Sequence, residues 1–443
     1  MNQDFMRTKP ILPLVLSMSL PMMLSMLINS LYNIVDSMFV ARLGEQALTA
    51  VSLVYPLQTL IVSIGVGFGV GINAAVAFFM GAGEKEKADR AASQGLFLSL
   101  VHGILLSVGT VICIPYFLPM FTADNRILAW GKEYAVIVLS FSVVVTVQIA
   151  FEKIYQSTGN MFVPMVCMAA GSITNIILDP VFIFGLGPVP RLEVKGAAIA
   201  TAIGQVVTLL LYLIWYCKKD MGLAIKKIYM KPSADIWRRV YMVGVPCSLT
   251  MGLPSLLITI LNGFAAAFSP IYILILGVYF KLQSFIYLPA NGIVQGMRPI
   301  LSYNYGADER KRMKRIIQIC GAMILAIMAV GMLLFLVFSG AIMKMFTEDG
   351  VTIREGALAL RIISFGFVVS SVSVVCSGAL EALGKGFASF LISALRYFAL
   401  IVPAAYLGIR IAGVIGIWTA FPAAEALTAV ASVIIFVICY KRK

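Results

Sequence analysis

The sequence has little charge and few of the side chains on which catalysis and metal binding depend. Only 12% of its 443 residues are charged, against about 25% in soluble domains. There is one histidine, His102, and the seven cysteines stand singly, without a CxxC pair or a metal-ligand spacing. These shortages argue against a soluble protein, a metal centre and an enzyme with a nucleophile–base pair. We expect no catalytic residue and no cofactor, and we expect His102 to be a packed residue.

Apolar residues dominate what is present. They make up 60% of the chain, the mean hydropathy is +0.96, and runs of about 20 apolar residues, enough to cross a bilayer, recur throughout. The short alternating segments of a membrane β-barrel are not visible. The predicted fold class is an all-α polytopic membrane protein with twelve transmembrane helices. These lie near residues 11–40, 47–80, 94–120, 134–157, 161–185, 196–218, 237–266, 271–303, 316–345, 357–383, 386–410 and 414–439. The first span is long and follows Arg7 and Lys9, so we expect it to be retained rather than cleaved.

The net charge of +14 comes from basic residues in alternate loops. The clusters are Lys85, Lys87 and Arg90; Lys218, Lys219, Lys226, Lys227, Lys231, Arg238 and Arg239; Arg310, Lys311, Arg312, Lys314 and Arg315; and Lys441, Arg442 and Lys443. The other loops are acidic or mixed. This positive-inside pattern predicts a multi-pass protein of the cytoplasmic (inner) membrane with both termini in the cytoplasm. It explains the charge without a nucleic-acid partner.

The chain also repeats itself at a fixed offset, the one that relates position 57 to position 282. Residues 57–90 align without gaps on 282–315, and the matches include Gly67 with Gly292 and Gly71 with Gly296. Pro21 and Pro246 keep the same offset, as do Gly159 and Gly384. We therefore predict an N-terminal six-helix lobe (1–221), a cytoplasmic linker (222–236) and a C-terminal six-helix lobe (237–443). An even number of spans gives both lobes the same orientation, so they form a parallel repeat around a central cleft whose rocking gives alternating access.

Two aspartates, Asp36 and Asp179, lie in otherwise apolar spans. A charge at bilayer depth costs at least about 2.5–3.5 kcal/mol and usually faces a cavity. Asn175 and Asp179 are separated by one helical turn and share one helix face. Their oxygens suit a cation such as Na⁺, and the carboxylate could instead carry a proton. Thr201 could add a hydroxyl, although Asn175 and Thr201 could also serve only as hydrogen bonds between helices.

The second half does not repeat these acids, because Leu261 and Ala404 stand at the positions equivalent to Asp36 and Asp179. It has its own acid in the last span, Glu425, which is a candidate contact for a cationic substrate or a second proton site. A further acid, Glu381, lies near a span end, where it could simply be solvated, and which of Glu425 and Glu381 contacts a substrate stays open.

Pro21 precedes Asp36 in the first span by about four helical turns. Proline bends a helix because it removes a backbone hydrogen bond. The bend is either a hinge that changes the surroundings of Asp36 or a fixed feature of helix shape.

With these residues in place, the chain resembles the multidrug and toxic compound extrusion (MATE) transporters over essentially its whole length. The resemblance rests on the first-span aspartate in VDSMFVARLG, the block NIILDPVFIFG…VKGAAIATAIG, the repeat of six spans, and the paired loops GAGEKEKA and GADERKRM. The second half, including GIWTAFPAAEAL, is most similar to the MepA-like bacterial branch.

The resemblance implies a secondary active antiporter that exports amphipathic, often cationic drugs or toxic organic compounds across the inner membrane in exchange for Na⁺ or H⁺. It implies V-shaped lobes, a cation-coupling site formed by Asp36, Asn175, Asp179 and Thr201, and a bend of the first helix at Pro21. The expected partners are these compounds, the coupling ion and the lipid bilayer, with the protein as a monomer.

Three alternatives remain open. A lipid-linked oligosaccharide flippase of the same superfamily should have a cationic central cavity, whereas the charges within the spans are mostly acidic, with Arg298 and Arg396 as exceptions. A channel would need a selectivity filter, which is not apparent. A membrane enzyme gains little support from a single histidine and unpaired cysteines.

Overall fold

The computed structural model describes residues 4–441, which form helices joined by short turns. The first half contains α1 (Phe5–Thr8), α2 (Ile11–Ala41), α3 (Glu45–Gly81), α4 (Lys85–Phe117), the short helix η1 (Leu118–Met120), α5 (Asn125–Ser140), α6 (Ser142–Ser157), α7 (Phe162–Phe184) and α8 (Glu193–Lys218). The second half contains η2 (Lys227–Met230), α9 (Ala234–Ala266), α10 (Pro270–Gly306), α11 (Arg310–Lys344), α12 (Gly350–Ala382), α13 (Gly386–Ala394), the π-helix η3 (Leu395–Ile401), α14 (Val402–Ala412) and α15 (Ile415–Lys441). Arg442 and Lys443, part of the last basic cluster, lie outside the described residues.

The prediction of an all-α membrane protein is confirmed. Eleven helical stretches within the described residues are long and apolar enough to cross a bilayer, and α5 with α6 supplies a twelfth as a pair bent by 43°. The span predicted near 134–157 is present, but it begins earlier, at Asn125, and its helix breaks at Phe141. At the break the Ser142 hydroxyl donates to the Leu139 carbonyl, a local bond that competes with the helical ladder. Hydropathy alone does not detect such a break.

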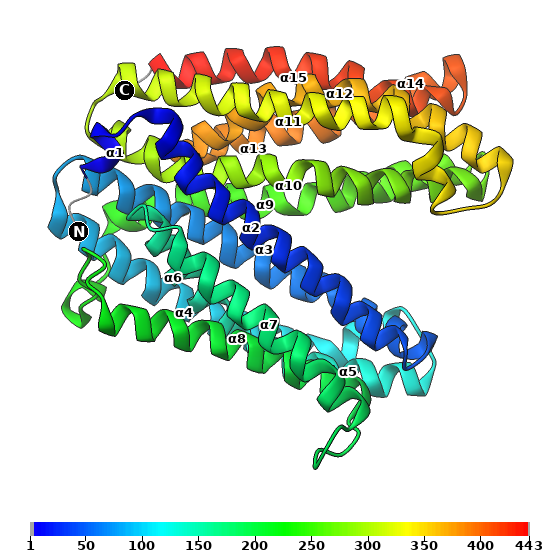
Figure 1. Ribbon diagram of the computed structural model, residues 1–443, viewed down its shortest axis with the longest axis horizontal. Helices are drawn as coiled ribbons and strands as arrows, with labels where there is room; N and C mark the ends of the chain where they lie inside the picture. The colour runs from blue at the N-terminus through cyan, green and yellow to red at the C-terminus, as the bar shows by residue number, and fades with distance from the viewer. Residues whose placement is uncertain (1–3, 442–443) are drawn as a thin grey trace.

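The helices form two bundles that diverge like the arms of a V (Figure 1). We call α2–α8 the N-terminal lobe and α9–α15 the C-terminal lobe. The lobes approach each other at the end that holds both chain termini and separate toward the opposite end. This shape agrees with two similar lobes, as the repeat predicts.

Glycines allow the lobes to meet closely at the end near the termini. A Cβ atom added to Gly81 on α3 would collide with the backbone of Tyr303 on α10, and one added to Gly306 on α10 would collide with the backbone of Phe78 on α3. The two contacts are equivalent under the offset of the repeat. The basic loops follow directly after Gly81 and Gly306, so the closed end is the predicted cytoplasmic end.

Helix α2 belongs to the packing of both lobes. Its first part buries Leu14, Met18 and Met22 in the large apolar core of the C-terminal lobe. Its far part packs on α7 of the N-terminal lobe and carries Asp36. A shift of α2 near Asp36 can therefore alter the packing of the same helix against the C-terminal lobe.

Candidate functional site

The four residues predicted to couple a cation lie together in the N-terminal lobe. Asp36 on α2 and Asp179 on α7 have carboxyl groups close enough to interact. Asn175, one turn before Asp179 on α7, donates from Nδ2 to Oγ1 of Thr201 on α8 at 3.3 Å. The site thus draws on three helices, of which the sequence pattern alone could relate only Asn175 to Asp179.

Close packing of α7 on α8 explains how Asn175 reaches Thr201. A Cβ built on Gly171 would lie 2.7 Å from the Gly204 carbonyl oxygen, and one built on Gly204 would lie 2.8 Å from the Gly171 carbonyl oxygen. The two helices therefore approach backbone to backbone one turn from the site, as small residues permit in membranes.

The chain continues as Pro180 directly after Asp179. Because proline has no N–H, the Ile176 carbonyl loses its helical partner. This places one more backbone acceptor on α7 within a turn of the carboxylate.

The acids of this site lack compensating donors. Asp179 is 0% exposed, yet both of its carboxylate oxygens, Oδ1 of Asp36 and Oδ1 of Asn175 have no hydrogen-bond partner within residues 4–441. None of the nine ion pairs in that range includes Asp36 or Asp179. Buried carboxylates without partners are unstable unless a proton or cation neutralises them. Within the same range no cluster of three or more His, Cys, Asp or Glu side chains could hold a metal. Two carboxylates with neutral oxygens instead suit a monovalent cation or a proton.

Two tyrosines at this site were not predicted. Tyr32, one turn before Asp36 on α2, places its hydroxyl beside Thr201 and near both aspartates. Tyr134 on α5 lies near Asp36 and accepts a long bond of 3.5 Å from Nε2 of Gln58 on α3. The spacing of Tyr32 and Asp36 on one helix face could have revealed the first, but no local signal points to Tyr134.

The second-half acids have a different environment, because each binds an arginine. Glu425 on α15 pairs with Arg396 on η3, and Arg396 also donates to the Tyr287 hydroxyl at 3.3 Å. Glu425 is only 3% exposed. The predicted contact of this glutamate with a substrate cation would therefore have to compete with an arginine already in place.

Glu381 on α12 is the second of these acids. The alternative that it is simply solvated is wrong, since it is 5% exposed. It pairs with Arg298 on α10, and its Oε1 accepts from the Ser389 hydroxyl at 2.9 Å. Its position near a helix end suggested exposure, but the turn after α12 folds back as α13 and covers it.

Both arginines line a cavity between the lobes with a volume of about 320 Å³. Its walls come from α2, α3, α9, α10, α12, α13 and η3, so both lobes contribute. Besides Arg298, Arg396 and Glu381, its lining is neutral polar or apolar: Met26, Val66, Gly67, Val70, Cys247, Thr250, Met251, Asn291, Val294, Gln295, Ser373, Val374, Ser377, Gly378, Ile392 and Ser393. The expectation that the intramembrane charges are mostly acidic does not hold at this cavity.

A buried lysine connects the lobes beside this cavity. Nζ of Lys153 on α6 donates to Glu152 at 2.8 Å and to Gln156 at 3.1 Å within the N-terminal lobe. It also donates to Oε1 of Gln295 in the C-terminal lobe at 3.0 Å. This lysine was not predicted as a site residue, and its partner Gln295 lies 142 residues away along the chain. Any rocking of the lobes must stretch or break the bond to Gln295.

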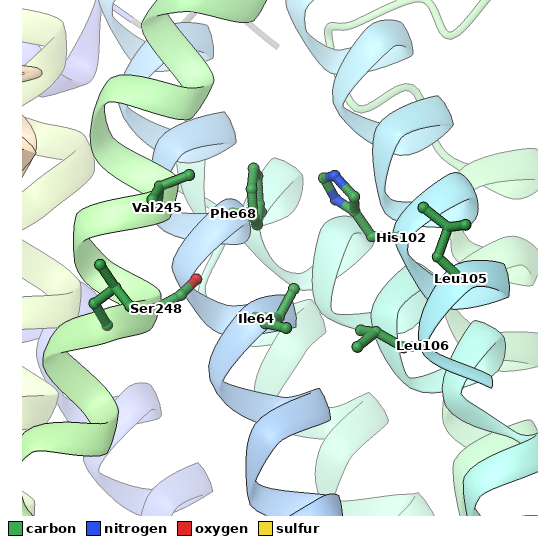
Figure 2. A pocket seen from close by; sticks show the side chains of 8 residues that line it. Ile64, Phe68, His102, Leu105, Leu106, Val245 and Ser248 are labelled. Atoms are coloured by element: carbon green, nitrogen blue, oxygen red, sulfur yellow. The ribbon is translucent and has the colours of Figure 1, made fainter. Parts of the chain in front are cut away.

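His102 lies in a separate groove between α3, α4 and α9, shown in Figure 2. The groove has a volume of about 360 Å³, and its lining is almost wholly apolar apart from His102 and Ser248. Nε2 of His102 is 3.0 Å from the Tyr241 hydroxyl, and its ring packs on Phe68. His102 is thus a packed and hydrogen-bonded residue, as expected. The exposed Leu105 and Leu249 at the rim suit contact with lipid.

Comparison with known proteins agrees with this architecture. The sequence model of the MatE family matches residues 21–181 and 246–407. The chain belongs to the MatE family. The matched stretches begin at Pro21 and Pro246, so the repeat seen in the sequence is the repeat of the family. The predicted family is confirmed, and the chain is a multi-pass membrane protein of a transporter family.

Three relatives show how far the similarity reaches. Multidrug export protein MepA of Staphylococcus saprophyticus is 26% identical over 421 residues, which cover 94% of this chain and 91% of MepA. A solved outward-facing multidrug resistance MATE transporter of the MOP superfamily has 25% identity and a TM-score of 0.89 over 98% of both chains. A MOP superfamily transporter from Pyrococcus furiosus, described as having a binding pocket of reversed polarity, has 24% identity and a TM-score of 0.91 over 99% of this chain and 97% of its own. At that identity, the last likeness supports the fold alone.

Proposed function

We propose that this MatE-family protein is a secondary active antiporter. It exports amphipathic, often cationic drugs or toxic organic compounds across the inner membrane in exchange for Na⁺ or H⁺. The observation that carries the proposal is the pair formed by the buried Asp179 and the partly buried Asp36. Neither is paired with a basic side chain among the described residues, and three of their four carboxylate oxygens are enclosed without a hydrogen-bond partner there. The names of the MepA relatives and of the outward-facing MATE neighbour support multidrug export.

The mechanism follows from the place of α2. A cation or proton at Asp36 and Asp179 removes the repulsion between the two carboxylates and favours a closer approach of α2 to α7. The same helix packs its first part into the C-terminal lobe. Binding at the ion site therefore biases the angle between the lobes, and release of the ion on the other side resets it. The interaction that differs between the two states supplies the coupling energy.

The test is transport by purified protein in liposomes. Efflux of a cationic amphipathic dye is followed by fluorescence under an imposed Na⁺ gradient, and separately under an imposed pH gradient. One of the two gradients should drive efflux, and that gradient identifies the coupling ion. Dye movement that responds to neither gradient would contradict antiport.

Two substitutions connect the transport to the site. Asp36→Asn and Asp179→Asn should each reduce gradient-driven efflux to the level of protein-free liposomes, because the neutral amide cannot exchange a cation or proton. The matched control is Asp235→Asn at the exposed start of α9, whose side chain is 65% exposed; it should transport normally. Wild-type efflux by either site variant at equal protein content would refute the proposed coupling site.

A further inference from the structure

The cavity between the lobes presents hydrogen-bond donors where the sequence led us to expect acids. Arg298 reaches it from α10 and Arg396 from η3, and only one acid, Glu381, shares the lining. The side chains of Arg298 and Arg396 are 19% and 11% exposed. We infer that this cavity holds an anionic oxygen group, such as a carboxylate or phosphate, of an amphiphilic compound, and that Arg298 and Arg396 recognise it. The inference rests on the proposed export function and adds a substrate class to it.

The hydrogen bonds within the two ion pairs leave spare capacity on the arginines. Each guanidinium has five N–H donors. The bonds to Glu381 and Glu425 engage Nη2 of each arginine, and Nη2 of Arg396 also donates to Tyr287. Within the described part of the chain, Nη1 of neither arginine donates to another protein group, and Nε of both is enclosed and without a partner. Both oxygens of Glu381 are already engaged, by Ser389 and by Arg298. Of the charged side chains that line the cavity, the two arginines thus keep unused donors and Glu381 keeps no unused oxygen, which favours an anion over a cation. Oε2 of Glu425 also lacks a partner, but Glu425 is not part of the lining.

The surrounding protein holds these donors in place. Arg298 is fixed by Glu381, which Ser389 orients in turn. Arg396 is fixed by Glu425 and by Tyr287, whose hydroxyl is 2.6 Å from that of Ser370. Donors positioned in advance bind an anion with a smaller entropy loss, and guanidinium groups match the planar geometry of carboxylate and phosphate.

The backbone conformation at Arg396 also supports a functional site there. This residue lies in the π-helix η3, a form that is rare and frequently found at functional sites. Pro403 follows shortly after it and cannot donate a backbone bond, which weakens the regular α-helical ladder there.

Charge balance limits the kind of anion. Each arginine is paired with one glutamate, so the two pairs carry no net charge. A multiply charged pyrophosphate would meet uncompensated repulsion from the glutamates. A single anionic group, alone or in a zwitterion, fits better. The flippase alternative therefore gains little from these arginines.

The remaining lining suits an amphiphilic body. Met26 and Met251 are flexible apolar side chains that adapt to different shapes, and Asn291, Gln295 and Ser377 offer neutral polar contacts. The volume of about 320 Å³ is at the lower end of ligand pockets, which span about 300–1,000 Å³.

Equilibrium binding tests the inference without any gradient. The probes are a fluorescent xanthene dye with a free carboxylate and the methyl ester of the same dye. Their binding to the wild-type protein in neutral phosphatidylcholine nanodiscs is followed by anisotropy, with empty nanodiscs as the blank. We expect the free carboxylate to bind about ten-fold more tightly than the ester, a difference of about 1.4 kcal/mol. Equal affinities, or tighter binding of the ester, would overturn the inference.

Paired substitutions identify the residues. Arg298→Gln with Glu381→Gln, and Arg396→Gln with Glu425→Gln, remove each charge together with its partner, so no buried charge is left alone. Each double variant should lose the preference for the carboxylate and keep its affinity for the ester, which also reports that the cavity is intact. The matched control, Arg90→Gln with Glu86→Gln, removes an exposed ion pair of α4 and should keep the preference. A preference that persists in both cavity variants would overturn the assignment.

Two further arms need no cavity variant. Octanoate should displace the bound carboxylate dye from the wild-type protein, and octylammonium should not; the reverse order would overturn the inference even if the double variants fail to fold.

Phosphatidylglycerol in the nanodisc should compete with the dye if a lipid headgroup is the natural anion, and should have no effect if a water-soluble compound is. Because no gradient is present, binding that fails here leaves antiport intact, and transport that fails in liposomes leaves this site intact.

Discussion

In the N-terminal lobe two neighbouring aspartates, one buried and one partly buried, are paired with no basic side chain among the described residues, whereas in the C-terminal lobe two buried glutamates each bind an arginine. Asp36 and Asp179 contribute oxygens that lack donors among the described residues, while Glu381 and Glu425 are held by Arg298 and Arg396. An acid without a fixed partner can exchange a proton or cation, and an acid with a fixed partner can position an arginine. This difference supports the proposal that coupling depends on the aspartates of the N-terminal lobe and anion recognition on the arginines of the C-terminal lobe.

The scaffold around these acids did not diverge in the same way. The Ser25 hydroxyl donates to the Pro21 carbonyl at 2.9 Å, and the Thr250 hydroxyl donates to the Pro246 carbonyl at 2.9 Å. Pro21 and Ser25 align with Pro246 and Thr250 at the offset of the repeat. Duplication thus kept the features that shape the helices and changed the side chains that carry charge.

Single substitutions of the acids in the two lobes should differ in their effect on stability, and this is the largest difference that we expect. Glu425→Gln leaves Arg396 buried without its carboxylate, which typically costs about 3–5 kcal/mol. Asp179→Asn replaces a carboxylate without donors by a neutral group of similar shape and should not destabilise the fold. The apparent unfolding temperature in detergent measures both: it should fall clearly for Glu425→Gln and stay level or rise for Asp179→Asn.

The double variant Arg396→Gln with Glu425→Gln is the control for this contrast. It should recover most of the loss seen in Glu425→Gln, because no unpaired charge remains. Equal unfolding temperatures for the two single variants would mean that the lobes do not differ in how they compensate buried acids.

The membrane spans and the repeat could be predicted from the sequence, but only part of the candidate site could. The spans could be predicted because each is a long apolar run, which is what a helix needs to lie in lipid. Asp36 and Asp179 were found as acids in apolar spans, Asn175 shares a helix face with Asp179, and Thr201 could be offered as one more ligand. Resemblance to a family was needed to place all four in one site. The partners of Glu381 and Glu425 lie 83 and 29 residues away along the chain. Such pairs depend on how helices pack, which the periodicity of a single span does not contain.

The matched prolines offer a smaller contrast, in turnover rather than stability. Pro21→Ala restores a backbone donor and should straighten α2, which carries Asp36 about 22 Å further along at about 1.5 Å per residue. We expect slower gradient-driven efflux with dye binding largely preserved. Pro246→Ala should slow efflux less, because Leu261 stands at the position equivalent to Asp36. Initial efflux rates and equilibrium dye binding measured on the same preparations separate the two effects. Equal losses in the two variants would mean that the bend contributes only to helix shape.

The smallest effects are expected at two helix caps that the repeat preserved. Asp124 accepts from the Arg126 backbone N–H at 2.8 Å at the start of α5, and Asp349 accepts from the Thr352 backbone N–H at 2.8 Å at the start of α12. These caps occupy equivalent positions at the offset of the repeat. Unlike the acids within the spans, they are the same in both lobes, so Asp124→Ala and Asp349→Ala should act alike. Each should speed amide hydrogen exchange in the first turn of its own helix and leave efflux unchanged, since a lost cap frees the first N–H groups.

Acidification sharpens the prediction for Asp349. Hydrogen bonds from the Thr352 hydroxyl and N–H hold the pKa of the Asp349 carboxyl below its usual value. A group whose pKa is lowered by folding stabilises the folded state above its unfolded pKa and loses that contribution as the pH falls through the folded value. First-turn protection in α12 should therefore persist at neutral pH and through mild acidification, and should vanish only below the usual range of an aspartate. Protection that is the same in wild type and Asp349→Ala at neutral pH would show that this carboxylate does not hold the end of the helix.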